Sequence, residues 1–529
     1  MLPALLSMPE STATETDDPA WRNFLHGLGE PALIAANAEH PDANTAFRPL
    51  PPISYWRINP AKFSLGFRLF HESRLSSGNG IACVTCHAGA LSGADRRRVS
   101  IGVGGAAGKL NALSVFNAAF NFRQFWDGRA VTLEDQALLP IETEFEMNNS
   151  LHVVSEFLNA DPAYNKQFAE VYPDGVSIAN MADAMAHYQS SSFIRLDTPF
   201  QDYLSGNENA LSTLEKNGLQ RFEELGCDSC HNGINLGGNS YQKLGFVVPY
   251  YGASDDNESA VSASIDDAGL AQRTNRQNDR YVFRVPGLHG VATTPPYFHD
   301  GSITTLEEAI RLMGKHQLGI RLSESDVDAI GAFLRSLGGH FNSSREGLPI
   351  TIADIELESS RWQLDPGSEN AELRNDEHAL AFRNILDSAA RTPKRIEEEL
   401  EKLVSGQVAH FDFIQFQHLE LIRYSRALIH PPSSLPASQR TRLSDEAEIL
   451  NKQVMALELN ISDFIQAYTL TQTLENLPRQ GSDVTLLSNQ EVESKLTAAR
   501  RQLQRAQSEI KTLTQDQVAQ IGVLQSILQ

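Results

Sequence analysis

The chain has 529 residues, of which 41% are hydrophobic and 21% charged, and its formal net charge at pH 7 is -22. The length is too great for one hydrophobic core, so several domains are predicted. The negative charge argues against a nucleic-acid partner and favours a basic protein partner. The sequence contains no run of about eighteen apolar residues, so no membrane span is predicted.

The first 60 residues are punctuated by prolines, which predicts an irregular arm rather than a helical or stranded region. A helical stretch follows. Gly66 and Phe70 lie in it, one turn apart. A glycine one helical turn from an aromatic residue suits close packing between two helices.

Two Cys-x-x-Cys-His motifs, residues 83–87 and 227–231, use all four cysteines of the chain. In such a motif two thioethers bind one haem and the adjacent histidine ligates its iron. Two covalent haem c groups are therefore predicted, with a structural zinc site or a thiol redox pair as the alternatives. The predicted haem-binding residues are Cys83, Cys86, His87, Cys227, Cys230 and His231.

Covalent haem attachment normally occurs outside the cytoplasm, so we expect a periplasmic protein. Residues 1–9 are apolar but short, and they lack the basic start and long apolar core of a secretion signal. We interpret this as a signal removed before residue 1, or as a misplaced gene start.

The surroundings of the second motif repeat those of the first. Gly218 and Phe222 have the spacing of the earlier glycine and phenylalanine, and Ser212-x-x-Glu215 is a capping box that starts their helix. A closing helix is predicted from Ser323 to about Leu337.

Met313 is the candidate sixth ligand of the second haem. Thr304-x-x-Glu307 is a capping box for the helix that carries it, and Leu306 and Ile310 share its face. The alternative is a core methionine. A filled sixth position gives electron transfer, and an open one gives chemistry.

Residues 341–529 contain no cysteine and are predicted to be helical, with apolar stripes over 411–429 and 443–468. A 3-4 pattern from Leu496 to Ile527 predicts a coiled coil or a bundle helix. Packing within the chain and pairing into a homodimer both remain open.

The predicted fold is mainly α, with two tandem cytochrome c-type haem domains and an additional all-α C-terminal region. The predicted units are an N-terminal arm at 1–60, haem domains at 61–205 and 206–340, and the helical extension at 341–529.

Three segments between the motifs and the closing helix resemble the bacterial di-haem cytochrome c peroxidases and their MauG-type relatives. Residues 125–130 read FWDGRA, 133–141 contain LE-x-Q and PI, and 296–309 contain PYFHDGS and TLEEA. The resemblance covers about residues 60 to 340 and includes neither the arm nor the C-terminal region.

The resemblance implies that His87 ligates the haem at which peroxide reacts. His231 and Met313 would ligate the haem at which electrons enter, and MauG itself has tyrosine in place of this methionine. Trp126 would lie between the haems, and Gln136 and Glu146 would form the polar pair of the peroxide pocket. The resemblance also implies one Ca²⁺ between the domains, held by the Asn111 side chain and the backbone carbonyls of Thr294 and Pro296.

One departure from the family concerns the segment Ser100–Gly104, which has Val103 where classical members have histidine. That histidine caps the peroxide-reacting iron until the other haem is reduced, and valine cannot ligate iron. We therefore expect an iron that is open without reductive activation, unless His152 or Met147 takes the position.

The predicted function is periplasmic reduction of hydrogen peroxide to water, with electrons from a small cytochrome c or a cupredoxin. Glu146 would serve as both base and acid. A MauG-like enzyme that oxidises Trp or Tyr on a partner protein is the first alternative, with the C-terminal region as its docking platform. The second is a di-haem electron carrier without enzymatic activity.

Overall fold

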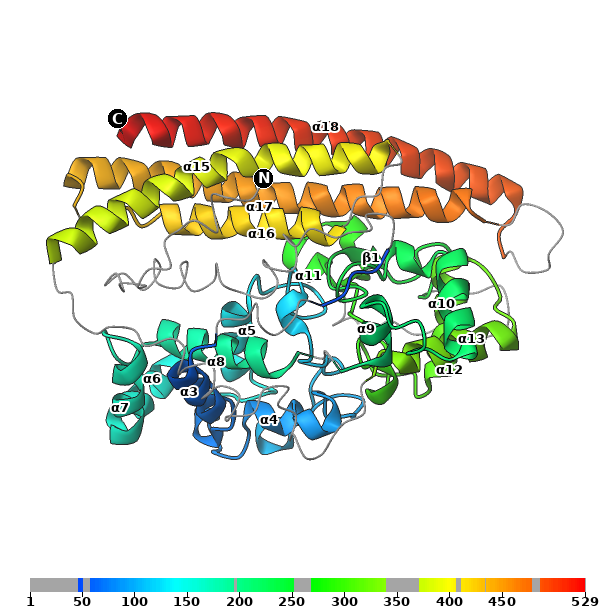
Figure 1. Ribbon diagram of the computed structural model, residues 1–529, viewed down its shortest axis with the longest axis horizontal. Helices are drawn as coiled ribbons and strands as arrows, with labels where there is room; N and C mark the ends of the chain where they lie inside the picture. The colour runs from blue at the N-terminus through cyan, green and yellow to red at the C-terminus, as the bar shows by residue number, and fades with distance from the viewer. Residues whose placement is uncertain are drawn as a thin grey trace.

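The computed structural model describes residues 46–50, 58–194, 197–251, 268–338, 371–405, 411–432, 434–477 and 486–528. They form two layers (Figure 1): a body, made of the described residues up to 338, and a bundle of four long helices, made of those from 371 onward. The mainly α prediction is confirmed, while most of the predicted arm lies outside the described residues. None of the described helices is long and apolar enough to cross a membrane.

The body consists of short helices joined by long turns, with one small sheet. Its helices are α3 (Pro60–Phe70), α4 (Cys83–Cys86), α5 (Leu133–Glu142), α6 (Leu151–Ala160), α7 (Pro162–Val171), α8 (Ile178–Ser192), α9 (Pro199–Leu204), α10 (Thr213–Glu224), α11 (Ala271–Thr274), α12 (Leu306–Met313) and α13 (Glu324–Ser336). The strands β1 (Tyr241–Lys243) and β2 (Val282–Arg284) pair antiparallel, with Tyr241 opposite Arg284.

The internal repeat appears as two matching helix pairs, α3 with α8 and α10 with α13. A Cβ atom on Gly66 would lie 2.0 Å from the carbonyl oxygen of Ala184 in α8, and one on Gly218 would lie 1.9 Å from that of Ala329 in α13. Each glycine thus lets its helix touch the backbone of the partner helix, which confirms the predicted close packing.

The predicted helix caps are confirmed at two of three positions. Ser212 forms the capping box of α10, and Ser323 caps α13. The Thr304 prediction is wrong by one residue, because Thr305 is the N-cap of α12 and accepts a hydrogen bond from the Glu308 backbone at 3.2 Å. Thr304 precedes Glu307, and Thr305 precedes Glu308, by the same three residues. The sequence pattern alone therefore could not show which threonine is the N-cap.

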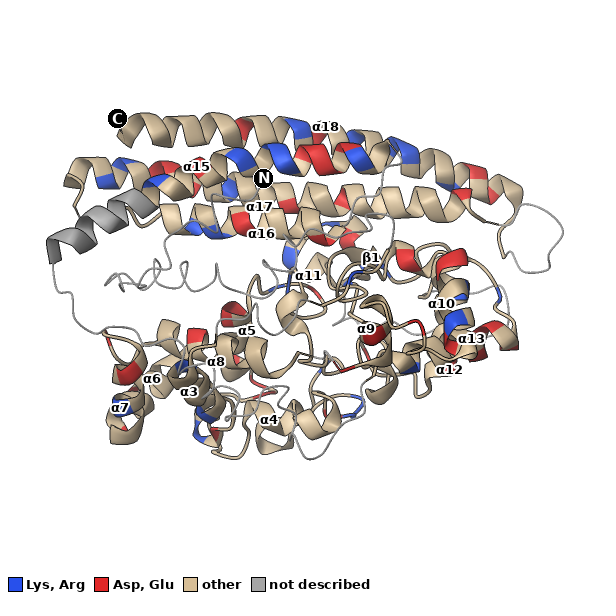
Figure 2. Cartoon of the chain, viewed as in Figure 1, with Lys and Arg blue, Asp and Glu red and all other residues tan. Residues whose placement is uncertain are grey.

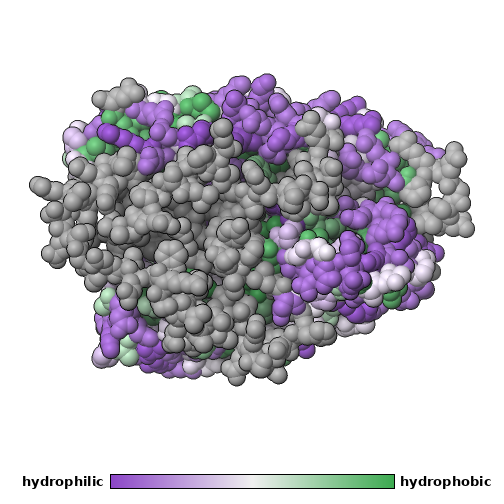
Figure 3. Space-filling model, in the orientation of Figure 1, coloured by the Kyte–Doolittle hydropathy of each residue, from purple (hydrophilic) through white to green (hydrophobic). Residues whose placement is uncertain are grey.

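The bundle consists of α15 (Ala371–Val404), α16 (Phe411–Leu428), α17 (Ala437–Glu475) and α18 (Asn489–Leu528), each packed against two others. The predicted stripe of α17 is buried from Leu443 to Phe464, and the 3-4 pattern of α18 packs against α17. Packing within the chain therefore accounts for this pattern. Residues of both charge signs are spread along α15 and α18 (Figure 2), and the surface over the upper edge of the bundle is largely hydrophilic (Figure 3).

The bundle docks on the body through apolar clusters and buried ion pairs. One cluster joins Phe120 and Val131 of the body to α16, and another joins Val247 and Ile320 to the end of α17 and the start of α18. Three ion pairs with buried carboxylates cross the same interface: Arg48 with Asp412, Arg123 with Glu458, and Arg273 with Glu458. Sequence analysis had predicted the extension but not its contact with the body.

Candidate functional site

The first Cys-x-x-Cys-His motif forms the short helix α4 and ends at His87. The Nδ1 of His87 lies 2.9 Å from the carbonyl oxygen of Gly93, and burial lowers the pKa of the imidazole. A neutral imidazole that donates through Nδ1 keeps a lone pair on Nε2. This is the arrangement in which histidine ligates a metal.

The second motif repeats this geometry. Its first cysteine begins a 3₁₀ turn, Cys227–Ser229, and Cys230 follows that turn. The Nδ1 of His231 lies 3.2 Å from the Leu236 carbonyl oxygen, and burial lowers the pKa of His231 to about 4. Both histidines are therefore held neutral by their surroundings and oriented by a backbone carbonyl that follows the motif.

The four cysteines are free thiols with partly exposed side chains. Burial raises the pKa of Cys83 and of Cys230 to about 12, and it raises the pKa values of Cys86 and Cys227 as well. Each pair of thiols lies beside a histidine that a backbone carbonyl orients, and this set of groups fits covalent haem. The described residues contain no group of three or more His, Cys, Asp or Glu side chains suited to a metal.

Glu146 lies in the turn after α5, next to the segment with Val103. The Val103 backbone N–H donates to the Glu146 carbonyl oxygen at 2.9 Å, and a Cβ on Gly102 would lie 2.4 Å from that oxygen. The Glu146 side chain is half-buried, whereas Glu142 and Glu144 are exposed. Burial raises the pKa of Glu146, and Arg129 opposes the shift.

Gln136 is half-buried on α5, on a different face from the buried Ala137 and Ile141. Of the two conceivable substitutes for the missing histidine, His152 is exposed and lies 3.4 Å from Glu156. Met147 is part of the apolar core that also contains α3 and α8 residues. The exposed position of His152 is therefore atypical of an iron ligand, whereas the cluster of Met147 also includes Cys83.

Met313 and Trp126 belong to one aromatic cluster. Both pack against the buried residues Leu244, Tyr250 and Phe283. The indole N–H of Trp126 donates to the Asn111 carbonyl oxygen at 2.9 Å. The structure therefore brings the candidate thioether ligand and the candidate electron relay to the same place.

The candidate calcium ligands come together less completely. Asn111 donates its backbone N–H to the His299 carbonyl at 2.7 Å, which places it beside the loop that carries Thr294 and Pro296. Its Nδ2 donates to the Arg97 carbonyl at 2.9 Å, so its Oδ1 is the side-chain atom suited to a hard cation.

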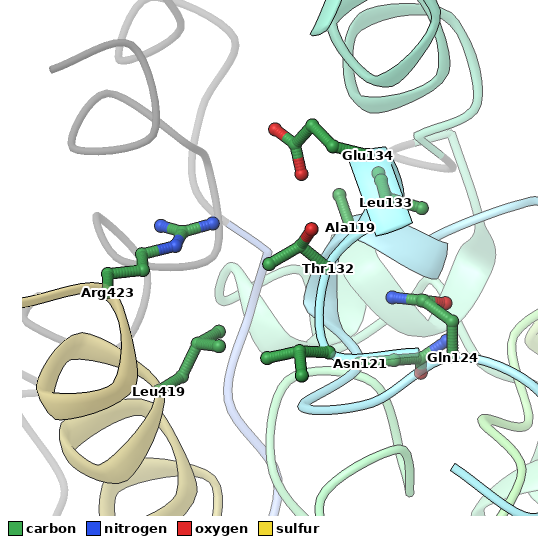
Figure 4. Close-up of a pocket in the computed structure, with 9 residues that line it drawn as sticks. Ala119, Asn121, Gln124, Thr132, Leu133, Glu134, Leu419 and Arg423 are labelled. Atoms are coloured by element: carbon green, nitrogen blue, oxygen red, sulfur yellow. The ribbon is translucent and has the colours of Figure 1, made fainter. Parts of the chain in front are cut away.

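No pattern in the sequence indicated that side chains of the bundle lie against the start of α5. A pocket lies between α16 and the start of α5, and Figure 4 shows Leu419 and Arg423 of α16 facing Thr132 and Glu134. The full lining is Ala119, Asn121, Gln124, Val131, Thr132, Leu133, Glu134, Leu419 and Arg423.

An ion pair continues this contact along α5. Arg426 of α16 lies 3.2 Å from Asp135, the residue before Gln136. The partners are 291 positions apart, and no local sequence pattern could have linked them.

The sequence is similar to those of known proteins of one family. Residues 60–209 match the family model of di-haem cytochrome c peroxidases. The chain is 45% identical over 279 residues to cytochrome c peroxidase Ccp of Escherichia coli (strain K12), covering 53% of this chain and 58% of that protein. It is 40% identical over 331 residues to cytochrome c551 peroxidase of Pseudomonas aeruginosa, covering 61% of this chain and 92% of that protein. A solved MauG-like protein associated with microbial copper homeostasis has a TM-score of 0.48 at 26% identity, covering 60% of this chain and 99% of that chain.

Proposed function

This chain belongs to the di-haem cytochrome c peroxidase family, and we propose that it reduces hydrogen peroxide to water in the periplasm with electrons from a small cytochrome c or a cupredoxin. The observation that carries the proposal is the position of Glu146. Its carboxyl group is half-buried with a raised pKa, and its backbone is bonded to the segment in which Val103 replaces a ligating histidine.

Each residue near the first motif has a definite task in this proposal. Bound haem would supply the iron at which the O–O bond is reduced, and two electrons and two protons convert one H₂O₂ into two waters. The Gly93 carbonyl fixes the ring of His87, which presents Nε2 to the iron. Glu146 would accept one proton of the peroxide and return it to the departing oxygen, and Gln136 would hold the peroxide by hydrogen bonding.

Residues near the second motif serve electron entry. His231 and Met313 would hold the iron of the second haem, and a methionine ligand raises the reduction potential, which suits an electron acceptor. Trp126 would carry electrons toward the first site. Its shared cluster with Met313 supports this assignment.

Val103 leads us to propose that the first iron is open in the fully oxidised protein, so that no reductive activation is needed. The exposed position of His152 supports this proposal. Two tandem haem domains, at 61–205 and 206–340, are part of the same proposal, supported by the matching Gly66 and Gly218 contacts. We also propose one structural Ca²⁺ at Asn111, Thr294 and Pro296.

Oxidation of Trp or Tyr on a partner protein is the second candidate function, because an iron without the capping histidine also suits that chemistry. Met313 in place of tyrosine favours peroxide reduction instead. Steady-state peroxide consumption with a reduced small cytochrome c distinguishes the two, since only the first function consumes peroxide with that donor as its sole reductant.

The first test of the proposal is an EPR and optical spectrum of the oxidised holoprotein before and after peroxide. We expect one high-spin and one low-spin ferric signal, and a rapid spectral change when peroxide is added. Two low-spin signals with no response to peroxide would show that another side chain caps the first iron, and would contradict the open site.

A further inference from the structure

The most buried charged contact between the bundle and the body surrounds Glu458 of α17. Its side chain is 1% exposed. It pairs with Arg123 and with Arg273, whose guanidinium nitrogen lies 2.9 Å from the carboxylate. A carboxylate so deeply buried is retained only when it is paired and hydrogen-bonded, so its two arginine partners are held in fixed positions.

Arg273, which Glu458 holds in place, in turn contacts Tyr241 of β1. The guanidinium donates to the Tyr241 hydroxyl at 3.3 Å. That hydroxyl in turn lies directly over Gly128, where an added Cβ would be only 1.7 Å from it. Gly128 also has a φ of +67°, so both the conformation and the contact require glycine.

The segment Phe125–Gly128 is therefore held from two sides. Arg284, which is paired with Tyr241 across the sheet, donates its backbone N–H to the Trp126 carbonyl at 2.8 Å and its Nε–H to the Phe125 carbonyl at 3.1 Å. The far end of the segment lies beneath the Tyr241 hydroxyl. A continuous series of contacts thus leads from Glu458 of the bundle to the backbone of Trp126.

The charges in this region show why a carboxylate is needed. Arg123, Arg273 and Arg284 enter it from the body, and Asp127 is the nearby acidic group on the segment itself. Burial lowers the pKa of Arg284 to about 10, which reflects the cost of burying the cations. Glu458 supplies negative charge from a helix that lies outside the part of the chain matched to the family model.

We propose that Glu458 is a positioning residue, which acts through Arg273 and Tyr241 to fix Trp126 and so controls electron transfer between the two haem sites. This inference depends on the proposed function in one respect, the role of Trp126 as the relay. It gives the C-terminal extension a task within the electron pathway in addition to any contribution to stability.

The test is ultraviolet resonance Raman spectroscopy of the holoprotein, which reports the hydrogen bond of an indole N–H. Trp126→Phe identifies the band of Trp126 among the four tryptophans of the chain. Glu458→Gln removes the charge at constant shape, and we expect it to shift this band and to slow electron transfer between the haems by up to about 10²-fold, the loss that a misplacement of about 1 Å can cause. Glu458→Asp keeps the charge and should restore part of both effects.

Two further variants separate positioning from general loosening. Tyr241→Phe removes only the hydroxyl that contacts Arg273, so it should shift the same band, and its effect should not add to that of Glu458→Gln. Asp412→Asn disrupts the other buried ion pair between bundle and body, and it should leave the Trp126 band in place.

An unchanged Trp126 band in Glu458→Gln, or an equal shift in Asp412→Asn, would overturn the inference and leave Glu458 with a structural role alone. Donor-driven peroxide turnover of the wild-type protein is measured alongside. Absence of that turnover contradicts the proposed function, whereas the Raman band still decides whether Glu458 positions Trp126.

Discussion

The two Cys-x-x-Cys-His motifs have nearly the same local geometry but very different surroundings. His87 and His231 are both neutral and bonded through Nδ1 to a carbonyl. Beside the first motif lie Val103 and a half-buried glutamate, and the contact with the bundle there includes a partly exposed ion pair. Cys227 of the second motif has an apolar contact with the bundle, and Met313 lies in an aromatic cluster.

This difference shows how one attachment motif can serve two tasks. The motif fixes the proximal histidine, while residues distant in sequence decide what faces it. A haem site with a titratable carboxyl group and no sixth ligand to its iron can transfer protons. An apolar haem site with a thioether ligand can transfer electrons.

The largest change in activity is expected at the proton-handling site. Glu146→Gln removes the base, so kcat/KM for peroxide should fall about 10²- to 10⁴-fold with both haems still bound. Glu144→Gln is the matched control, because Glu144 is exposed and should be nearly silent.

The pH profile of the same pair of variants gives a second check. Burial raises the pKa of Glu146 above its ordinary value, so the carboxylate that acts as base is lost as pH falls through that raised pKa. Wild-type kcat/KM should therefore decline on the acid side at a pH above the ordinary glutamate value, and Glu146→Gln should lack this limb. A limb retained in the variant would assign it to another group.

Val103→His would supply a sixth ligand to the first iron, as Met313 is proposed to do for the second. An imidazole can occupy the first iron, so the high-spin signal of the oxidised protein should disappear. Peroxide reactivity before reduction should fall about 10- to 100-fold if the open form is only about 1–10% populated. Val103→Ala should keep both the signal and the reactivity, and a high-spin signal retained in Val103→His would place residue 103 away from the iron.

Met313→Leu keeps the volume of the side chain but removes the thioether. The potential of the second haem should fall, and each drop of about 59 mV makes one-electron reduction tenfold less favourable. Spectroelectrochemical titration measures the shift. Reaction of the first site with peroxide in a single turnover should be unaffected, and an unchanged potential would show that Met313 is only a core residue.

The smallest effect is expected where the bundle contacts the first site. Arg426 and Asp135 are both partly exposed, so Arg426→Gln should lower the free energy of unfolding by about 0–1 kcal/mol.

The ion pair of Asp412 with Arg48 differs because it is buried, and the Asp412 carboxylate also lies 3.4 Å from the backbone nitrogen of Ile234. Asp412→Asn should lower the free energy of unfolding by about 3–5 kcal/mol, measured by denaturant titration of the holoprotein. Equal losses in Asp412→Asn and Arg426→Gln would contradict the contrast between the buried and the partly exposed ion pair.

Local features of the sequence predicted much of this molecule. The glycines at 66 and 218, the capping serines at 212 and 323, and the stripe of α17 each depend on neighbours within a few turns. The docking of the bundle could not be predicted, because Arg123 and Glu458 meet across 335 positions. A buried ion pair leaves no periodic pattern in the sequence, and neither residue is unusual in its own segment.

The contact of Cys227 with the bundle places the extension at the point where the second haem would be attached. Cys227 packs against the apolar cluster formed with Leu474, Val492 and Leu496. Apolar side chains of α17 and α18 would therefore border a haem held at this sulfur and limit the access of water to it. Because solvent access is one of the factors that set a haem's potential, the extension would help to tune the proposed electron-entry site.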